Sequence, residues 1–186
     1  MIKRTAASST ALILVLASMV LSFDRPAMAK DAADIEADAR TALVNLYIAV
    51  PAAKALSEKA VAILVFPSIL KAGFIVGGQY GEGVLFKNDE TAGFYDSVAA
   101  SYGLQAGAQK YGYALFFMTD SAVRYLEKSR GWEIGTGPSI ALVDEGMARS
   151  MTTTTLNSDI YAFTFDQKGL MAGLGIQGTK VTKIRK

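Results

Sequence analysis

The chain has 186 residues, 51% of them hydrophobic, and a formal net charge of +2 from 19 Lys and Arg against 17 Asp and Glu. It has no cysteine and no histidine, which excludes disulfides, thiolate metal sites and the Ser-His-Asp arrangement. An enzyme would have to work with carboxylates, lysines and hydroxyls alone. An enzyme is therefore the least expected class of function, and we expect neither a metal nor a cofactor.

The first 29 residues have the three parts of a secretory signal peptide. Lys3 and Arg4 give a charged start, residues 11–21 form an apolar run, and residues 27–29 (Ala-Met-Ala) fit the small-x-small cleavage rule. The apolar run is short for a membrane span, and an uncleaved N-terminal anchor is the alternative. We expect cleavage at the end of residues 1–29.

Cleavage there leaves residues 30–186, which we expect to form a single domain. This part carries equal numbers of basic and acidic residues, so a general nucleic-acid-binding surface is not expected. The signal predicts an exported protein that is periplasmic, associated with the envelope or secreted.

Residues 31–59 form the predicted helical lead. Residues 31–50 keep apolar side chains at helical spacing and place acidic ones near the N-terminal end, where they complement the helix dipole. Pro51 ends or restarts the helix, and a short second helix is expected over residues 52–59. We expect these helices to pack on a sheet; a membrane-surface helix is the alternative, although such helices favour Lys and Arg on the polar face.

Residues 60–186 form a β-rich body of short apolar runs separated by turns. Thr119 or Asp120 caps one further helix, which ends before Gly131. Pro67 is expected to stop the first strand. We expect strands at residues 61–66, 74–76, 83–86, 93–98, 102–109, 111–118, 132–143, 150–156, 160–165 and 170–184, with turns at 87–91 and 166–169.

A glycine-punctuated apolar phrase occurs three times, at residues 73–81, 103–109 and 169–178. In each copy one glycine follows another after four positions, so both lie on one face of a strand. A face without side chains lets the sheet bend sharply, or lets another layer or a lipid chain come close. Small-residue helix contacts are the alternative, but each helical glycine costs about 1 kcal/mol. The predicted fold class is α+β, with N-terminal helices packed on a strongly curved, Gly-rich antiparallel sheet or barrel.

The stretch from Val65 to Leu85, which contains Val65-Phe66-Pro67-Ser68 and the first glycine phrase, resembles the SYLF family, also called Ysc84-like or DUF500. Three later segments agree in order, and the likeness covers roughly residues 60–184. These segments are YGLQAGAQ at residues 102–109, GWEIG at 131–135, and KGLMAG with GTK at 168–173 and 178–180.

The resemblance implies a lipid-binding module that is not an enzyme. Eukaryotic relatives bind phosphoinositides and some bind actin, whereas bacterial relatives are exported envelope proteins, often lipoproteins. This chain lacks the lipoprotein cysteine, and an exported context makes actin an unexpected partner. The expected partners are a phospholipid or fatty acyl ligand and a membrane surface, with an anionic phospholipid or phosphoinositide-like ligand. The alternative is an envelope protein that binds a protein partner through an exposed sheet edge or aromatic patch.

Two sets of residues are candidates for lipid contact. Basic groups near an anionic surface each contribute about 1 kcal/mol, and a solvated charged rim is the alternative for them. The candidate headgroup residues are Lys71, Lys87, Lys110, Lys180, Lys183, Arg185 and Lys186. An acyl groove would gain about 0.8 kcal/mol per buried CH₂, and ordinary core packing is the alternative. The candidate groove residues are Phe74, Gly77, Leu85, Leu104, Gly107, Phe117, Phe163, Met171 and Gly173.

Overall fold

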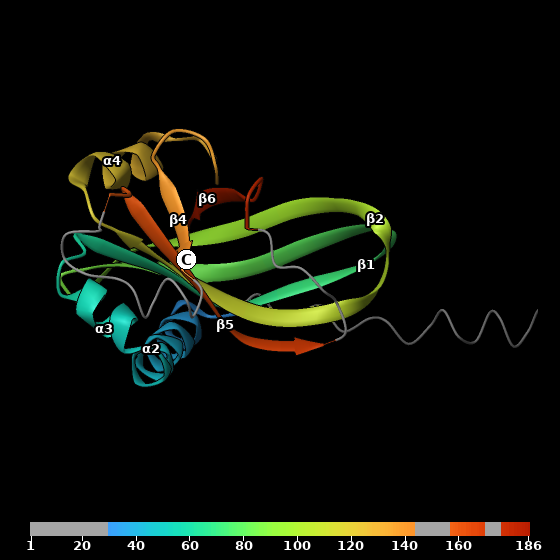
Figure 1. Cartoon of the computed structure of the whole chain (residues 1–186), viewed down its shortest axis with the longest axis horizontal. Coiled ribbons are helices and arrows are strands. Elements are labelled where there is room, and N and C mark those ends of the chain that lie inside the picture. Colours follow the sequence, from blue (N-terminus) through green and yellow to red (C-terminus); the bar gives the residue numbers. More distant parts are fainter. Residues whose placement is uncertain (1–29, 144–156, 170–175) are drawn as a thin grey trace, which may run out of the picture. The chain divides into compact units, whose positions relative to one another are not determined.

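The computed structural model describes residues 30–143, 157–169 and 176–186, and Asp31–Lys186 form one compact unit. Its fold is α+β, with N-terminal helices on a strongly curled, mostly antiparallel half-barrel sheet, as predicted (Figure 1). The predicted signal peptide, the strand at 150–156 and residues 170–175 lie outside the described residues. The described helices and strands are α2 (Ala32–Ala49), α3 (Pro51–Ser57), β1 (Ala62–Lys87), β2 (Glu90–Phe117), α4 (Asp120–Lys128), β3 (Trp132–Glu133), β4 (Ile140–Val143), β5 (Ile160–Gly169) and β6 (Lys180–Ile184).

One long hairpin of β1 and β2 is the framework of the sheet. The two strands pair antiparallel from Ala62 opposite Phe117 to Lys87 opposite Glu90. Asn88 and Asp89 close the hairpin with φ of 50° and 62°, which is the left-handed conformation that two-residue hairpin turns require. The polar turn predicted at residues 87–91 is therefore confirmed.

The prediction that Pro67 stops the first strand is wrong. β1 is one continuous strand where separate strands were expected at 61–66, 74–76 and 83–86. The pairing register shifts between Phe66 and Ile69. This irregularity spans Pro67 and Ser68, so the proline, which has no N–H to give to a regular ladder, interrupts the pairing without ending the strand.

β2 holds the rest of the sheet together because its two halves have different neighbours. Its first half pairs with β6 and its second half with β5, both antiparallel, while β3 adds to β6 and β4 adds parallel to β5. The turn predicted at residues 166–169 is wrong: these residues belong to β5, where a register shift opposite Tyr111 leaves Asp166 with a φ of 52°. The single strand expected at 132–143 is instead the short strands β3 and β4.

β1 bends back on itself at the first glycine phrase. A Cβ atom on Gly73 would collide with the Cα atom of Gly77, and one on Gly83 would collide with the Val65 carbonyl oxygen. Such approaches require bare backbone. The glycine spacing predicts a bend and the close approach of a second layer, and the structure has both. The second layer is the other half of the same strand. The helical alternative is excluded for residues 73–81 and 103–109, which lie in β1 and β2.

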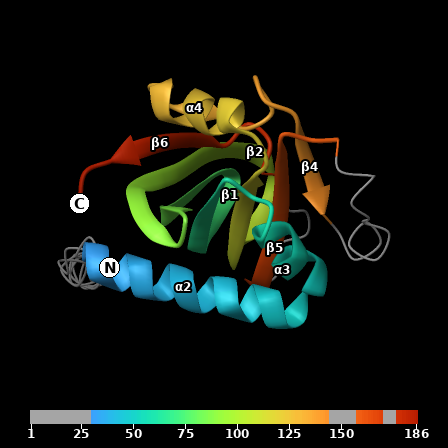
Figure 2. The same cartoon turned by 90° about the vertical axis from the view of Figure 1, so that its left-hand side faces the viewer.

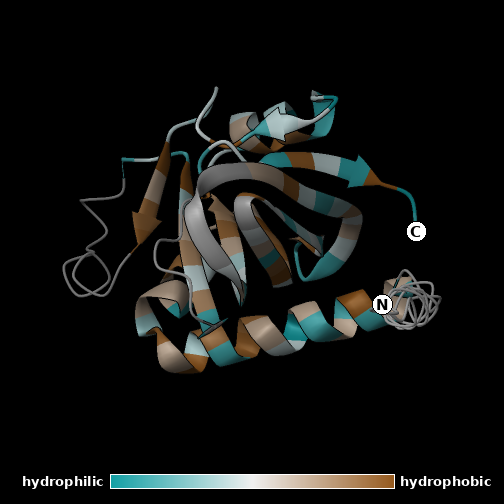
Figure 3. Ribbon diagram, turned by 90° about the vertical axis from the view of Figure 1, so that its right-hand side faces the viewer, coloured by the Kyte–Doolittle hydropathy of each residue, from teal (hydrophilic) through white to brown (hydrophobic). Residues whose placement is uncertain are grey.

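Figure 2 shows α4 on one side of the sheet and α2 with α3 on the other. One hydrophobic cluster contains residues of α4, and a second contains residues of α2 and α3. We call the cluster beside α4 the concave cluster and the cluster beside α2 and α3 the outer cluster. α2 presents Ile35, Ala39 and Leu46 to the outer cluster, and along its length hydrophobic and hydrophilic residues alternate (Figure 3). The Thr119 hydroxyl accepts from Ala122 N at 3.3 Å at the start of α4. The predicted helices, including the restart at Pro51, are confirmed.

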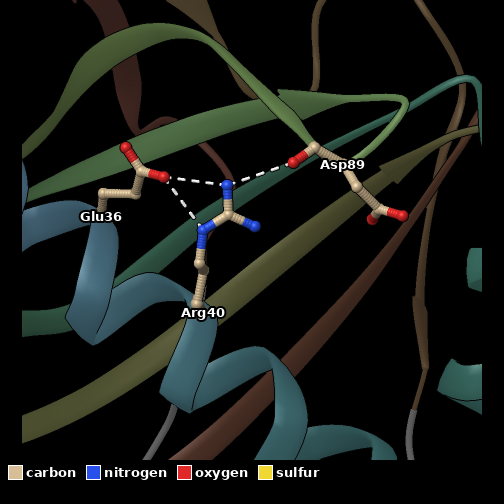
Figure 4. A network of polar contacts seen from close by, with 3 residues as sticks. All are labelled: Glu36, Arg40 and Asp89. Carbon is tan, nitrogen blue, oxygen red and sulfur yellow. Dashed lines mark hydrogen bonds and ion pairs between the residues drawn. The ribbon is translucent and has the colours of Figure 1, made fainter.

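Arg40 attaches α2 to the β1–β2 turn. Its Nε and Nη2 donate to Glu36 Oε1 at 2.9 and 2.8 Å, and Nη2 also donates to the Asp89 carbonyl oxygen at 3.1 Å (Figure 4). The guanidinium carbon lies 4.7 Å from the centroid of the Phe86 ring. Within the described residues, none of the helices has the length and apolar character needed to cross a bilayer.

Candidate functional site

The seven predicted headgroup residues do not form one cluster. Lys87 Nζ lies 2.6 Å from Glu127 Oε1 of α4. Lys186 Nζ lies 2.8 Å from Glu82 Oε1, and these two side chains are only 12% and 14% exposed. Because both lysines already have a carboxylate partner, they are the weakest candidates for an anionic ligand. The exposed candidates on and after β6 are Lys180, Lys183 and Arg185.

Lys110 is different because a second lysine lies opposite it. Lys110 of β2 and Lys168 of β5 are direct partners in the antiparallel ladder, and both are exposed. On its other side Lys110 pairs with Leu70 of β1, which is 57% exposed. We call Leu70, Lys110 and Lys168 the Leu70 row. Like charges placed directly opposite each other destabilise a sheet, and a bound anion would relieve that repulsion.

A second row of the same kind lies beyond the bend. Tyr80 of β1 pairs with Val98 of β2, which pairs with Lys180 of β6. Tyr80 is 52% and Val98 is 43% exposed, and Lys180 is exposed as well. We call these three residues the Tyr80 row. Each row therefore runs across three strands from exposed apolar side chains to lysine.

The two rows share the end of the sheet that the described helices leave open. Val76, 57% exposed, lies in β1 between the two rows. Figure 1 shows the bend of β1 and β2 extending away from α2, α3 and α4. Exposed apolar side chains beside cations are the composition of a membrane-contacting surface. The pairing register places this surface on the outer side of the sheet, because Ile69 and Gln79, which precede the two rows in β1, are buried.

Lys168 was not among the predicted site residues. Residues 166–169 were interpreted as a turn, and a lysine in a turn gives no indication of a cross-strand partner. The available signal was its position in the third segment of the family resemblance, next to Gly169.

The predicted groove residues are not brought together. Leu85 and Phe117 belong to the concave cluster, whereas Phe163 belongs to the outer cluster on the opposite face of the sheet. All three are at most 2% exposed, as ordinary core packing requires. Gly77 lies at the bend and Gly107 in β2. The side chains of Phe74 and Leu104, and residues Met171 and Gly173, lie outside the described part of the structure.

A polar layer crosses the concave face toward the bend. Tyr111 donates its hydroxyl to Gln79 Oε1 at 2.9 Å, and Gln79 Nε2 donates to Thr179 Oγ1 at 2.9 Å. Tyr113 likewise donates to Ser97 Oγ at 2.8 Å. Burial raises the pKa of Tyr111 to about 12, so its hydroxyl stays protonated near neutral pH and serves as a hydrogen-bond donor, not as a base. Sequence reasoning missed this layer, because a tyrosine in a strand resembles any other aromatic residue of the core and gives no sign of a hydrogen-bond partner for its hydroxyl.

A cleft of about 410 Å³ lies between the β1–β2 turn and α4. Its charged lining is mixed, with Lys87 and Arg124 beside Asp120 and Glu127, and it contains no nucleophile activated by a neighbouring base. Among the described residues no group of acidic side chains is arranged to hold a metal ion.

Part of the chain matches a known protein family. The family described as "Ysc84: Las17-binding protein actin regulator" matches residues 98–186. No curated protein matches the chain. The matched span includes three lysines of the two rows, namely Lys110, Lys168 and Lys180.

Proposed function

We propose that the protein, whose residues 98–186 match the Ysc84 (SYLF, DUF500) family, binds anionic phospholipid at a membrane surface without catalysis. The observation that carries the proposal is the pairing of Lys110 with Lys168 beside the exposed Leu70. Lipid binding is also what the resemblance of the sequence to this family implies.

The two rows supply both attractions that a peripheral membrane protein uses. Each lysine near an anionic surface contributes about 1 kcal/mol, and this attraction weakens with salt. The exposed apolar side chains Leu70, Val76 and Tyr80 add burial in the headgroup region at about 25 cal/mol per Å² of apolar area. Together these terms give reversible, salt-sensitive binding and need no enclosed acyl pocket.

We further propose that the chain works outside the cytoplasm, in the periplasm or at the envelope. The support is the charged, apolar and small-residue pattern of the first 29 residues. In that setting the lipid surface is the anionic phospholipid of a bacterial envelope.

Vesicle flotation tests the proposal. The purified chain is mixed with phosphatidylcholine vesicles with and without 30% phosphatidylglycerol, at roughly 50 and 300 mM salt. We expect binding to the anionic vesicles alone, weaker at high salt. The Lys110→Gln/Lys168→Gln variant should lose most of this binding, with a flatter salt dependence.

The matched control is Lys59→Gln/Lys128→Gln, which removes the same charge from exposed positions away from the two rows. It should bind almost as the wild type does. If both double variants lose binding equally, the rows are not the contact surface. If the wild type fails to float with either kind of vesicle but retains a protein partner in pull-downs, the protein-binding alternative replaces the proposal.

A further inference from the structure

A buried hydrogen-bond acceptor without a partner lies on the concave face of the hairpin. Gln109 is 4% exposed, and its Oε1 has no hydrogen-bond partner in the described structure. Buried side-chain oxygens are nearly always hydrogen-bonded, because an unpaired one keeps its desolvation penalty. The Gln109 oxygen is thus a position where a donor from outside the chain would be favourable.

Lys71 is the neighbour of this acceptor. Lys71 and Gln109 are direct partners in the β1–β2 ladder, so their side chains share one face with Cβ atoms about 5 Å apart. Lys71 is half-buried and forms no ion pair within the described residues. The next pair on this face, Gly73 and Gly107, contributes no side chain above them. An ammonium group and an unpaired acceptor therefore lie side by side at the bend.

The groups deeper in the concave face are already paired with one another. The Tyr111 hydroxyl is bonded to Gln79, and Gln79 is bonded to Thr179. Beyond them the face becomes apolar at Leu115 and Phe117. Lys71 and Gln109 therefore keep unused hydrogen-bonding capacity at the bend, and farther from the bend the buried Tyr95 hydroxyl also has no partner in the described structure.

The chemistry of these two groups defines the ligand. An ammonium attracts an anion, whereas an amide oxygen only accepts, so a ligand that engages both groups offers a negative charge and a hydrogen-bond donor a few ångströms apart. A phosphodiester that carries a hydroxyl or a protonated amine on its alcohol has both. Glycerol and ethanolamine headgroups fit this description, and choline does not, because its quaternary nitrogen has no N–H.

We propose that the concave face binds one phospholipid headgroup of the glycerol or ethanolamine type, with Lys71 on the phosphate and Gln109 Oε1 accepting from the hydroxyl or ammonium. This inference rests on the proposed function for its class of ligand. It adds selection by headgroup structure to the charge-based binding of the two outer rows.

Soluble short-chain lipids separate the two sites. Dihexanoyl phosphatidylglycerol, phosphatidylethanolamine and phosphatidylcholine are titrated into the purified chain below their micelle concentrations and followed by calorimetry. We expect the first two to bind about tenfold more tightly than phosphatidylcholine, the ratio for one lost hydrogen bond that leaves a buried group unpaired. Equal binding of all three by the wild type overturns the inference, and this comparison needs no variant to fold.

Substitutions of Gln109 and Lys71 then test the role given to each residue. Gln109→Met should lose the tenfold preference while its vesicle flotation stays as in the wild type, and Lys71→Met should weaken all three short-chain lipids. The control Lys110→Gln/Lys168→Gln should keep the preference and lose flotation. A Gln109→Met protein that is folded by circular dichroism and still prefers phosphatidylglycerol overturns the assignment.

Two further outcomes separate this inference from its premise. Intact flotation with no binding of any short-chain lipid overturns the concave site and leaves the proposed function standing. Glycerophosphoglycerol, which has no acyl chains, tests the source of the headgroup: binding as tight as that of the lipid supports the site and assigns it to a soluble phosphodiester.

Discussion

Gly81 lies directly against Ser68, although thirteen positions of the same strand separate them. A Cβ atom on Gly81 would be 2.5 Å from the Ser68 carbonyl oxygen and 2.5 Å from Ile69 Cδ1. This contact exists because β1 bends back at its glycines. The Ser68 oxygen and the Ile69 side chain, which is fully buried, lie in a closely packed interior with little room to move aside, so the fold requires the absence of a side chain at Gly81.

Gly81→Ala is therefore expected to destabilise the protein by about 2 kcal/mol, within the range for overpacking. Gly78→Ala is the matched control on the same strand, because its nearest neighbour would be Ala99 O at an ordinary 3.7 Å. The control should be neutral or slightly stabilising. Urea denaturation followed by the fluorescence of Trp132, the sole tryptophan and 2% exposed, measures both. Equal losses of unfolding free energy in the two variants would show that the close approach at Gly81 does not make a side chain there unfavourable.

Arg40→Ala is expected to lower the free energy of unfolding by about 1 kcal/mol. The ion pair with Glu36 is partly exposed and contributes little, so most of the effect should come from the stacking on Phe86 and the bond to Asp89 O. Arg124→Ala, also a helical arginine and exposed, is the control and should change stability by less than about 0.5 kcal/mol. Thermal denaturation of both variants measures this, and a loss of similar size in the control would contradict the role given to Arg40.

The helices and the bend were predictable because their signals are local. The helical spacing in α2 and the cap at Thr119 are patterns of a few neighbouring residues, and the spacing of the glycines indicates where a second layer comes close. The continuity of β1 was not predictable, because Pro67 stops a regular ladder but not a ladder with a bulge. Only the pairing of Phe66 with Tyr113 and of Ile69 with Tyr111 reveals the bulge.

The candidate site was less predictable than the fold for the same reason. Lys110 is a plain surface lysine in the sequence, and Lys168 becomes its neighbour only through the pairing of β2 with β5, far apart in the chain. Lys87 and Lys186 were predicted on charge alone, and their partners Glu127 and Glu82 are equally remote. Sequence reasoning identified the kinds of residue, and tertiary pairing decides which remain available.

Acid is expected to weaken the attachment of β4 to β5. Ser139 donates to Asp159 Oδ2 through its hydroxyl at 2.7 Å and its N–H at 3.0 Å, and these bonds lower the pKa of Asp159 below its usual 3.8. A depressed pKa contributes stability above the unfolded value that is lost as the pH falls through the folded value. Unfolding free energies from about pH 6 down to about pH 2 should therefore fall less steeply for Asp159→Asn than for the wild type. The control Asp120→Asn should follow the wild type.

Alkali is expected to act through the tyrosines of the concave face. Burial raises the pKa of both Tyr95 and Tyr111 to about 12. A raised pKa contributes stability that is complete below the unfolded value near 10 and is lost as the pH rises through about 12.

Tyr95→Phe tests this contribution most directly, because the Tyr95 hydroxyl is buried without a partner in the described structure. Its removal should cost nothing near pH 7 and should flatten the alkaline loss. Tyr113→Phe, which breaks the bond to Ser97, should instead cost about 1 kcal/mol near pH 7. Urea denaturation at about pH 8 and about pH 11 measures both effects, and an unchanged alkaline loss in Tyr95→Phe would place the titrating groups elsewhere.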